Sequence, residues 1–194
     1  MNQVGAIILA AGASTRLGQP KQLVKLGAEN LLERAVRLAR ESGCAPIIVV
    51  LGSSAESIQS QSDLGDAIVV INNGWAEGMG SSVRTGVAFL SGVVGTILMT
   101  CDMPSVTSAH LRALMSSGEP TASSYAGRLG VPAYLPSSSF EALQSLKGDT
   151  GARQLLRTAH PLNLPHGEMD IDTIEDLDQA RKHFEQAPAL NFED

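Results

Sequence analysis

The chain has few cysteines and no long apolar run, and each shortage excludes a class of protein. Cys44 and Cys101 are its two cysteines. Both lie at the edges of apolar segments, so we expect buried, reduced thiols rather than a disulfide scaffold or a zinc site. No apolar stretch approaches the roughly 20 residues of a membrane-spanning helix, and residues 1–5 lack the basic and apolar parts of a secretion signal. We therefore expect a cytoplasmic protein without a membrane partner.

Basic residues are also scarce. The 14 lysines and arginines are outnumbered by 20 aspartates and glutamates, which gives a formal net charge of -6. This balance, without a contiguous basic patch, argues against a nucleic-acid partner. The length of 194 residues and the 43% hydrophobic content suit one core. We expect a single domain over residues 1–187 and a flexible tail over residues 188–194.

Motifs that bind nucleotides in other folds are missing too. The pattern G-x-x-x-x-G-K-[ST] of P-loop kinases and GTPases does not occur. Gly78-Met79-Gly80 resembles the start of G-x-G-x-x-G, but Val83 stands in place of the third glycine. A dehydrogenase that binds a nicotinamide cofactor is therefore disfavoured. The four histidines lack the spacing of metal ligands.

The chain does contain an alternation of apolar runs and segments with helical spacing. Strands are expected at Ala6–Ala10, Ile47–Leu51, Ala67–Ile71, Thr96–Thr100 and Val131–Leu135. Helices are expected at Leu31–Ser42, Ala55–Gln61, Ser82–Leu90, Ser138–Leu146, Gly151–Arg157 and Thr173–Phe184. A capping-box pattern, Thr173 followed by Asp176, opens the last helix. Continuous apolar strands separated by helices predict an α/β fold with a mostly parallel sheet covered on both faces.

The loop after the first strand carries the most informative residues. The sequence from Leu9 to Leu23 is LAAGASTRLGQPKQL. Gly12 permits close backbone approach, while Arg16 and Lys21 are suited to grip phosphate oxygens. In an open parallel sheet, ligands bind at the carboxyl ends of the strands. The alternative is a solvated surface loop with incidental cations.

Carboxylates follow at a second strand end and near the last helix. Asp102 comes directly after the strand Thr96–Thr100, where it can offer an oxygen ligand to Mg²⁺ or serve as a turn or N-cap residue. Mg²⁺ seldom relies on one carboxylate, and Asp170 and Asp172 are the candidates for the second. If Asp102 and Asp172 converge, we expect asparagine at either position to relieve like-charge repulsion and raise stability modestly without metal.

The motifs together resemble a known family. They occur in this order: LAAGASTRLGQPKQL, NGWAEGMGSSVRTGV, CDMP, GRLGVP, LKGDTGARQLL and DIDTIEDL. From about Ala6 to Ala180, the chain resembles the molybdenum cofactor cytidylyltransferases, within the wider group of MobA-like nucleotidyltransferases. The resemblance implies a Rossmann-like three-layer α/β/α sandwich of the nucleotide-diphospho-sugar transferase type, in agreement with the expected strands and helices.

The resemblance also implies roles for individual residues. The residues that would bind the nucleotide are Ala10, Ala11, Gly12, Arg16, Lys21, Gly80 and Ser82. Arg16, Lys21 and Asp102 would be catalytic, and Asp102 and Asp172 would hold Mg²⁺. Ser82 would contact cytosine while Gly80 lets the base approach, although Ser82 could simply be an N-cap. Asp149 and Arg153 would orient the acceptor or form a structural Asp–Arg pair.

The implied activity is a Mg²⁺-dependent transfer of CMP from CTP to the phosphate of molybdopterin or molybdenum cofactor, with release of pyrophosphate. Family members that use cytosine carry LAAG and those that use guanine carry LAGG, so Ala11 favours CTP. A molybdenum hydroxylase or its chaperone would be a further partner. Three alternatives stay open: another nucleotidyl transfer with GTP or a sugar phosphate, a non-catalytic cofactor-binding accessory protein, and a nicotinamide-dependent oxidoreductase on the same sheet.

Overall fold

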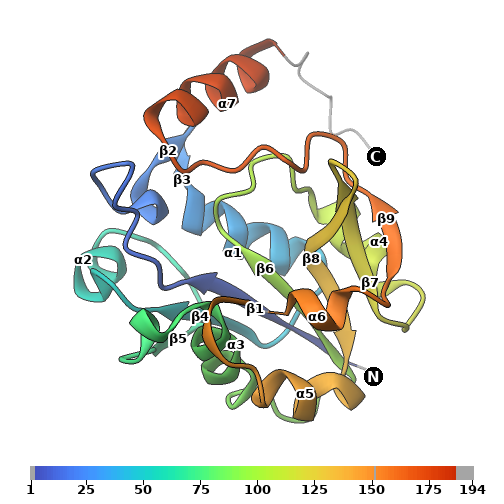
Figure 1. Ribbon diagram of the computed structural model, residues 1–194. Helices are drawn as coiled ribbons and strands as arrows, with labels where there is room; N and C mark the ends of the chain where they lie inside the picture. The colour runs from blue at the N-terminus through green and yellow to red at the C-terminus, as the bar shows by residue number, and fades with distance from the viewer. Residues whose placement is uncertain (1–2, 151, 187–194) are drawn as a thin grey trace.

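A seven-stranded mixed sheet forms the centre of the molecule, in a computed structural model that describes residues 3–150 and 152–186 (Figure 1). The strand order is β5-β4-β1-β6-β8-β7-β9. The parallel strands are β1 (Val4–Ala10), β4 (Ile47–Leu51), β5 (Ile68–Ile71) and β6 (Gly95–Thr100). The others are β8 (Arg128–Pro136), antiparallel to β6, β7 (Thr121–Tyr125), antiparallel to β8, and β9 (His160–Asn163), parallel to β7. The expected α/β fold with a mostly parallel sheet is confirmed.

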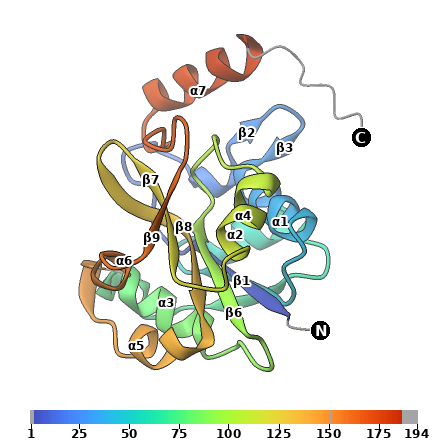
Figure 2. The same cartoon turned by 90° about the vertical axis from the view of Figure 1, so that its right-hand side faces the viewer.

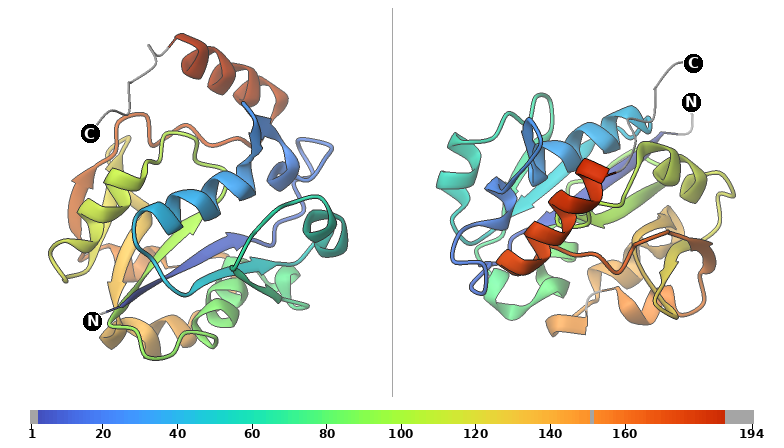
Figure 3. Two further views of the ribbon diagram at one scale, coloured as in Figure 1. Left: turned by 180° about the vertical axis from the view of Figure 1, so that it is seen from behind. Right: turned by 90° about the horizontal axis from the view of Figure 1, so that it is seen from above.

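Helices cover both faces of this sheet (Figure 2). One face carries α1 (Leu31–Glu41), α2 (Ala55–Ser60) and α4 (Ser108–Met115), and α1 runs across it as seen from behind (Figure 3). The opposite face carries α3 (Met79–Val87), α5 (Phe140–Gln144) and α6 (Arg153–Leu156). Single turns of 3-10 helix occur at Lys21–Leu23 (η1), Trp75–Glu77 (η2), Ser137–Ser139 (η3) and Gly148–Thr150 (η4). The result is a three-layer sandwich.

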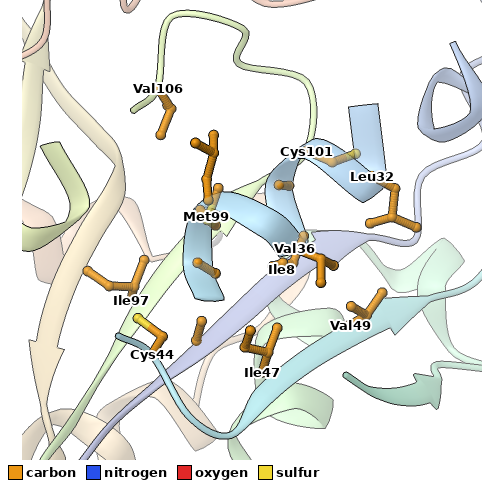
Figure 4. Close-up of a cluster of buried hydrophobic side chains, with 14 of the residues drawn as sticks. Ile8, Leu32, Val36, Cys44, Ile47, Val49, Ile97, Met99, Cys101 and Val106 are labelled. Atoms are coloured by element: carbon orange, nitrogen blue, oxygen red, sulfur yellow. The ribbon is translucent and has the colours of Figure 1, made fainter. Parts of the chain in front are cut away.

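The sheet separates two hydrophobic clusters, and β1 supplies side chains to both. Ile8 packs under α1 with Leu32 and Val36 (Figure 4). Ile7 points the other way and packs against Val83 of α3. Because successive side chains of a strand face opposite sides, a strand buried on both faces must be apolar throughout, as the run from Ala6 to Ala10 is.

A third, smaller cluster fastens α7 (Ile174–Gln186) beside the hairpin of β2 (Lys25–Leu26) and β3 (Glu29–Asn30). It joins Leu17 of the loop after β1 to Ile171 and Leu177. The predicted capping box precedes α7: Thr173 N–H donates to Asp176 Oδ2 at 2.8 Å, and Asp176 N–H donates to Thr173 Oγ1 at 3.2 Å. The segment before α7 is thereby fixed next to the loop after β1.

Some elements differ from the expectations. β7 and β9 were not expected, because TASSY and HPLN contain few apolar residues and β9 lies at an edge of the sheet. The third helix begins at Met79 rather than at Ser82. Gly151, expected to open a helix, and the expected tail at 188–194 lie outside the described residues. Within 3–150 and 152–186, no helix combines the length and apolar character needed to cross a membrane.

Candidate functional site

The loop after β1 is held by a glutamine that the sequence did not single out. Gln22 is fully buried, and its Nε2 donates to the carbonyl oxygens of Ala10 at 2.7 Å and Gly12 at 3.3 Å. The backbone N–H of Lys21 donates to Ser14 Oγ at 3.1 Å. These hydrogen bonds hold the loop after β1 both near Gly12 and at Lys21, so the backbone of Lys21 is fixed in place. Nothing in the sequence selects Gln22, because a glutamine next to the candidate Lys21 has no distinctive pattern.

Lys21 lies between two of the predicted carboxylates. Its Nζ donates to Asp102 Oδ2 at 2.5 Å and to Asp172 Oδ1 at 2.7 Å. Arg16 completes the cluster by donating to Asp172 Oδ2 at 2.6 Å. The backbone N–H of Ile171 donates to the carbonyl oxygen of Asp102 at 3.0 Å, which ties the two acidic segments together. Asp102 and Asp172, which lie 81 and 151 positions after Lys21 in the sequence, thus meet at its ammonium group.

The charges in this cluster stabilise one another. Burial alone would lower the pKa of Lys21, but the nearby Asp102 and Asp172 outweigh it and raise that pKa. The hydrogen bond from Lys21 lowers the pKa of Asp172. Asp170, the other candidate, forms no salt bridge with the cations that the structure describes. Burial, then the charges of Asp102 and Asp172, raise its pKa. The structure therefore favours Asp172 over Asp170 as the partner of Asp102.

The ion pairs reverse the expected effect of asparagine at position 102 or 172 on stability without metal. Lys21 neutralises the repulsion that asparagine at position 102 or 172 was expected to relieve. Removing either carboxylate leaves a mostly buried lysine with one partner fewer, which costs stability. In place of the modest gain expected from the sequence, we therefore predict that either substitution lowers stability without metal.

Asp172 should make stability depend on acid pH. Its pKa is lower folded than in the unfolded chain, so its contribution is fully present above the unfolded value of about 3.9 and is lost as the pH falls through the folded value. In urea unfolding, Asp172→Asn should be less stable than the unmodified protein at pH 7, and the difference should shrink by pH 3. Glu56→Gln, at an exposed position of α2, is the control. A difference that is constant with pH would contradict the ion pair's role.

A cavity of about 360 Å³ opens beside the cluster. The predicted site residues that line it are Ala10, Ala11, Gly12, Lys21, Ser82, Asp102 and Asp149. The side chain of Arg16 is 71% exposed and does not line the cavity. Ser82 lies inside α3, whose N-cap is Gly78, so the N-cap alternative for Ser82 is wrong. Its Oγ accepts from Asn72 Nδ2 at 3.0 Å, which orients this hydroxyl in the cavity wall.

Gly78 and Gly80 bring the loop at 147–149 against α3. A Cβ at Gly80 would lie 2.9 Å from the carbonyl oxygen of Gly148, and one at Gly78, whose φ is +119°, would lie 2.7 Å from the carbonyl carbon of Gly148. Arg84 of α3 donates to the carbonyl oxygen of Leu146. Gly80 does not line the cavity. The structure thus gives this glycine a packing role against the loop, and the packing sets Asp149 in the cavity wall.

A second cavity of about 260 Å³ adjoins the first. Both are lined by Met79, Thr100, Asp102 and Asp149, so Asp102 stands at their boundary. Arg153 lines the second cavity only. No salt bridge joins Asp149 to Arg153 in the described part of the chain, so the alternative of a structural pair finds no support.

The two carboxylates that contact Lys21 supply some of the oxygen ligands that a divalent cation needs, but not all of them. Asp102 Oδ2 and Asp172 Oδ1 already converge on one positive charge, and hard cations such as Mg²⁺ prefer oxygen ligands. Among residues 3–150 and 152–186, no group of three or more histidines, cysteines, aspartates or glutamates is arranged to hold a metal. A cation here would therefore need further oxygens from a ligand, as is common for Mg²⁺ bound with phosphates.

Several known proteins are similar to this chain in sequence or in fold. A family model described as the MobA-like NTP transferase domain matches residues 6–164. The chain is 30% identical over 193 residues to the nicotine blue oxidoreductase of Paenarthrobacter nicotinovorans, covering 90% of this chain and 94% of that protein. It is 31% identical over 195 residues to the purine catabolism protein PucB of Bacillus subtilis (strain 168), covering 91% and 95%. A solved complex of Rv0371C from Mycobacterium tuberculosis H37Rv with manganese superposes with a TM-score of 0.78 at 27% identity, covering 93% and 98%.

Proposed function

Because the chain belongs to the MobA-like NTP transferase family, we propose that it transfers CMP from CTP to the phosphate of molybdopterin or molybdenum cofactor. The observation that carries the proposal is the convergence of Asp102 and Asp172 on Lys21 beside a cavity of about 360 Å³, a size typical of small-molecule sites. The choice of CTP and of the acceptor is supported by the motif resemblance. A molybdenum hydroxylase or its chaperone would then receive the product.

The proposed reaction needs no general base. An anionic oxygen of the acceptor phosphate attacks the α-phosphorus of CTP, the bond to the bridging oxygen breaks, and pyrophosphate leaves. Catalysis then consists of positioning and charge neutralisation. Lys21 and Arg16 would exchange carboxylate partners for phosphate oxygens, while the backbone of Ala10, Ala11 and Gly12 lies along the nucleotide. The acceptor would enter through the second cavity, past Asp149 and Arg153.

Asp102 and Asp172 would hold the divalent cation, Mg²⁺ in the proposed reaction. When bound, it would neutralise charge on the phosphates. Lys21 lies between both carboxylates, so its ammonium group must move toward the phosphates before they can share a cation. The manganese complex of Rv0371C supports a divalent cation in a related fold.

This arrangement predicts how Lys21 affects metal binding without turnover. Lys21→Gln should bind Mn²⁺ in the absence of nucleotide about tenfold more tightly than the unmodified protein, since two carboxylates lose their competing cation. Electron paramagnetic resonance of free Mn²⁺ measures this directly. Lys25→Gln, an exposed lysine of β2, is the control. Equal affinities in the two variants would show that Lys21 does not compete with the cation.

Ala11 provides the test of nucleotide choice. We expect faster pyrophosphate release with CTP than with GTP in excess Mg²⁺, and a smaller preference in Ala11→Gly, because a methyl group in the cavity wall restricts the larger purine. One methyl group accounts for roughly a tenfold effect. Equal rates with CTP and GTP in the unmodified protein would contradict the proposed specificity and favour another nucleotidyl transfer.

Hydride transfer is a second candidate because a relative 30% identical is named nicotine blue oxidoreductase. The same preparation should be mixed with NADH or NADPH and followed by absorbance. Oxidation of either cofactor by a substrate, without pyrophosphate release from any nucleotide, would replace the proposed transfer. Binding of molybdenum cofactor without either reaction would favour a non-catalytic accessory protein.

A further inference from the structure

A buried asparagine connects the end of β5 to α3. Asn72 directly follows β5 and is 6% exposed. Its Nδ2 donates to Ser81 Oγ at 2.8 Å and to Ser82 Oγ at 3.0 Å. Its Oδ1 accepts from the backbone N–H of Gly74 at 2.9 Å. Both hydrogens of the side-chain amide are therefore used within the protein.

The hydrogen bond from Gly74 determines which way round this amide lies. A backbone N–H can only donate, so the atom of Asn72 that faces it must be the oxygen. The amide nitrogen then faces the two serines and gives one hydrogen to each hydroxyl oxygen. Because this nitrogen has no lone pair to offer, neither hydroxyl can donate to it in return.

The hydroxyl hydrogens of the two serines have different partners. Ser81 Oγ donates to the carbonyl oxygens of Gly78 at 2.8 Å and Gly74 at 3.1 Å. Ser82 Oγ donates to no residue in the part of the chain that the structure describes. Ser82 lines the first cavity, whereas Ser81 does not. The hydroxyl hydrogen of Ser82 is therefore available to a ligand in that cavity.

We propose that Asn72 is a positioning residue that presents the Ser82 hydroxyl as a hydrogen-bond donor to the edge of cytosine formed by O2 and N3. This inference rests on the proposed function, which places CTP in the cavity that Ser82 lines. Both atoms of that edge accept hydrogen bonds in cytosine, whereas N3 of uracil carries a hydrogen. A buried hydroxyl hydrogen that meets an N–H stays unpaired, which costs free energy. The two residues thus select cytosine over uracil, a base of similar size that the methyl group of Ala11 cannot exclude.

Aspartate at position 72 reverses the polarity of this contact and keeps the size of the side chain. Its carboxylate can still accept from the N–H of Gly74, but it has no hydrogens to give to the serines. The Ser82 hydrogen then turns toward the carboxylate, and the hydroxyl oxygen meets the base as an acceptor. The added negative charge opposes CTP and UTP alike, because both carry the same triphosphate. The ratio of their Kd values therefore isolates the contact with the base.

Isothermal titration calorimetry at pH 8, with Mg²⁺ and without an acceptor, measures this ratio. We expect the unmodified protein to bind CTP about tenfold more tightly than UTP, and Ser82→Ala and Asn72→Asp to bind the two within about twofold of each other. The double variant should have the same ratio as Ser82→Ala, since Asn72 acts through Ser82. Ser81→Ala is the matched control, because Ser81 contacts Asn72 but does not line the cavity. It should keep the ratio of the unmodified protein.

A second variant at position 72 avoids a buried charge. Asn72→Ser keeps an oxygen for the N–H of Gly74 but is too short to reach Ser82, so its ratio should fall by at least about threefold. A purely structural role for Asn72 would weaken both nucleotides and leave the ratio unchanged in each folded variant at this position, which would overturn the proposal.

Equal affinities for CTP and UTP in the unmodified protein would also overturn it, as would a ratio that stays about tenfold in Ser82→Ala. Because no acceptor is present, failure of CMP transfer to molybdopterin would contradict the proposed function and leave these ratios readable.

Discussion

Asp102→Asn is expected to reduce pyrophosphate release by at least about 100-fold, the scale of losing one group that stabilises charge in a transition state. Asp102 stands where the two cavities meet and contacts Lys21 at 2.5 Å. Asparagine keeps the size of the side chain but removes the charge that both Lys21 and a divalent cation require. The fold should persist, because β6 and its apolar neighbours are unchanged.

Steady-state rates and thermal unfolding should be measured on the same preparations. Asp66→Asn is the matched control, since Asp66 is an exposed aspartate that pairs with Arg40 away from the cavities. It should keep full turnover. Asp102→Asn that folds and retains more than a third of the turnover would remove this carboxylate from the proposed mechanism.

Lys21→Ala is expected to lower both turnover and stability. Turnover should fall by about 100-fold, because a fixed cation no longer meets the phosphates. Stability at pH 7 should also fall, since Asp102 and Asp172 then face each other without the ammonium group between them. The hydrogen bond from Lys21 lowers the pKa of Asp172, so the contribution of this pair is lost as the pH falls below the unfolded value of about 3.9. The loss of stability in Lys21→Ala should therefore be smaller near pH 3 than at pH 7.

Lys25→Ala separates this effect from a general loss of positive charge in the same region. Lys25 is exposed, so its replacement should leave the melting temperature and the turnover nearly unchanged. If Lys21→Ala and Lys25→Ala behave alike in both measurements, Lys21 acts as a solvated surface lysine, which is the alternative that the sequence left open.

The buried half of the fold was predictable from the sequence because its strands are apolar on both faces. The expected strand at Ile47–Leu51 matches β4, and the expected run Ala6–Ala10 lies within β1. β7 and β9 were not predicted, because a strand paired near a sheet edge needs less apolar surface. For this part of the sheet, main-chain hydrogen bonding to neighbours decides the structure, and periodicity carries little of that information.

The site was predictable where chemistry is concentrated in short motifs. Asp102 and Lys21 follow strand ends, and their meeting agrees with the rule that ligands bind there. Gln22 was not foreseen because a buried amide that braces a loop resembles any other glutamine in the sequence.

Transfer of label from α-³²P-CTP to molybdopterin decides whether the protein has the proposed activity. We expect the unmodified protein with Mg²⁺ to form one labelled cytosine dinucleotide for each pyrophosphate released, and Asp102→Asn to form almost none. The reaction should stop when the metal is chelated and resume when Mg²⁺ is restored. Molybdopterin that stays unlabelled, with folded protein, CTP and Mg²⁺ all present, would contradict the proposed transfer of CMP.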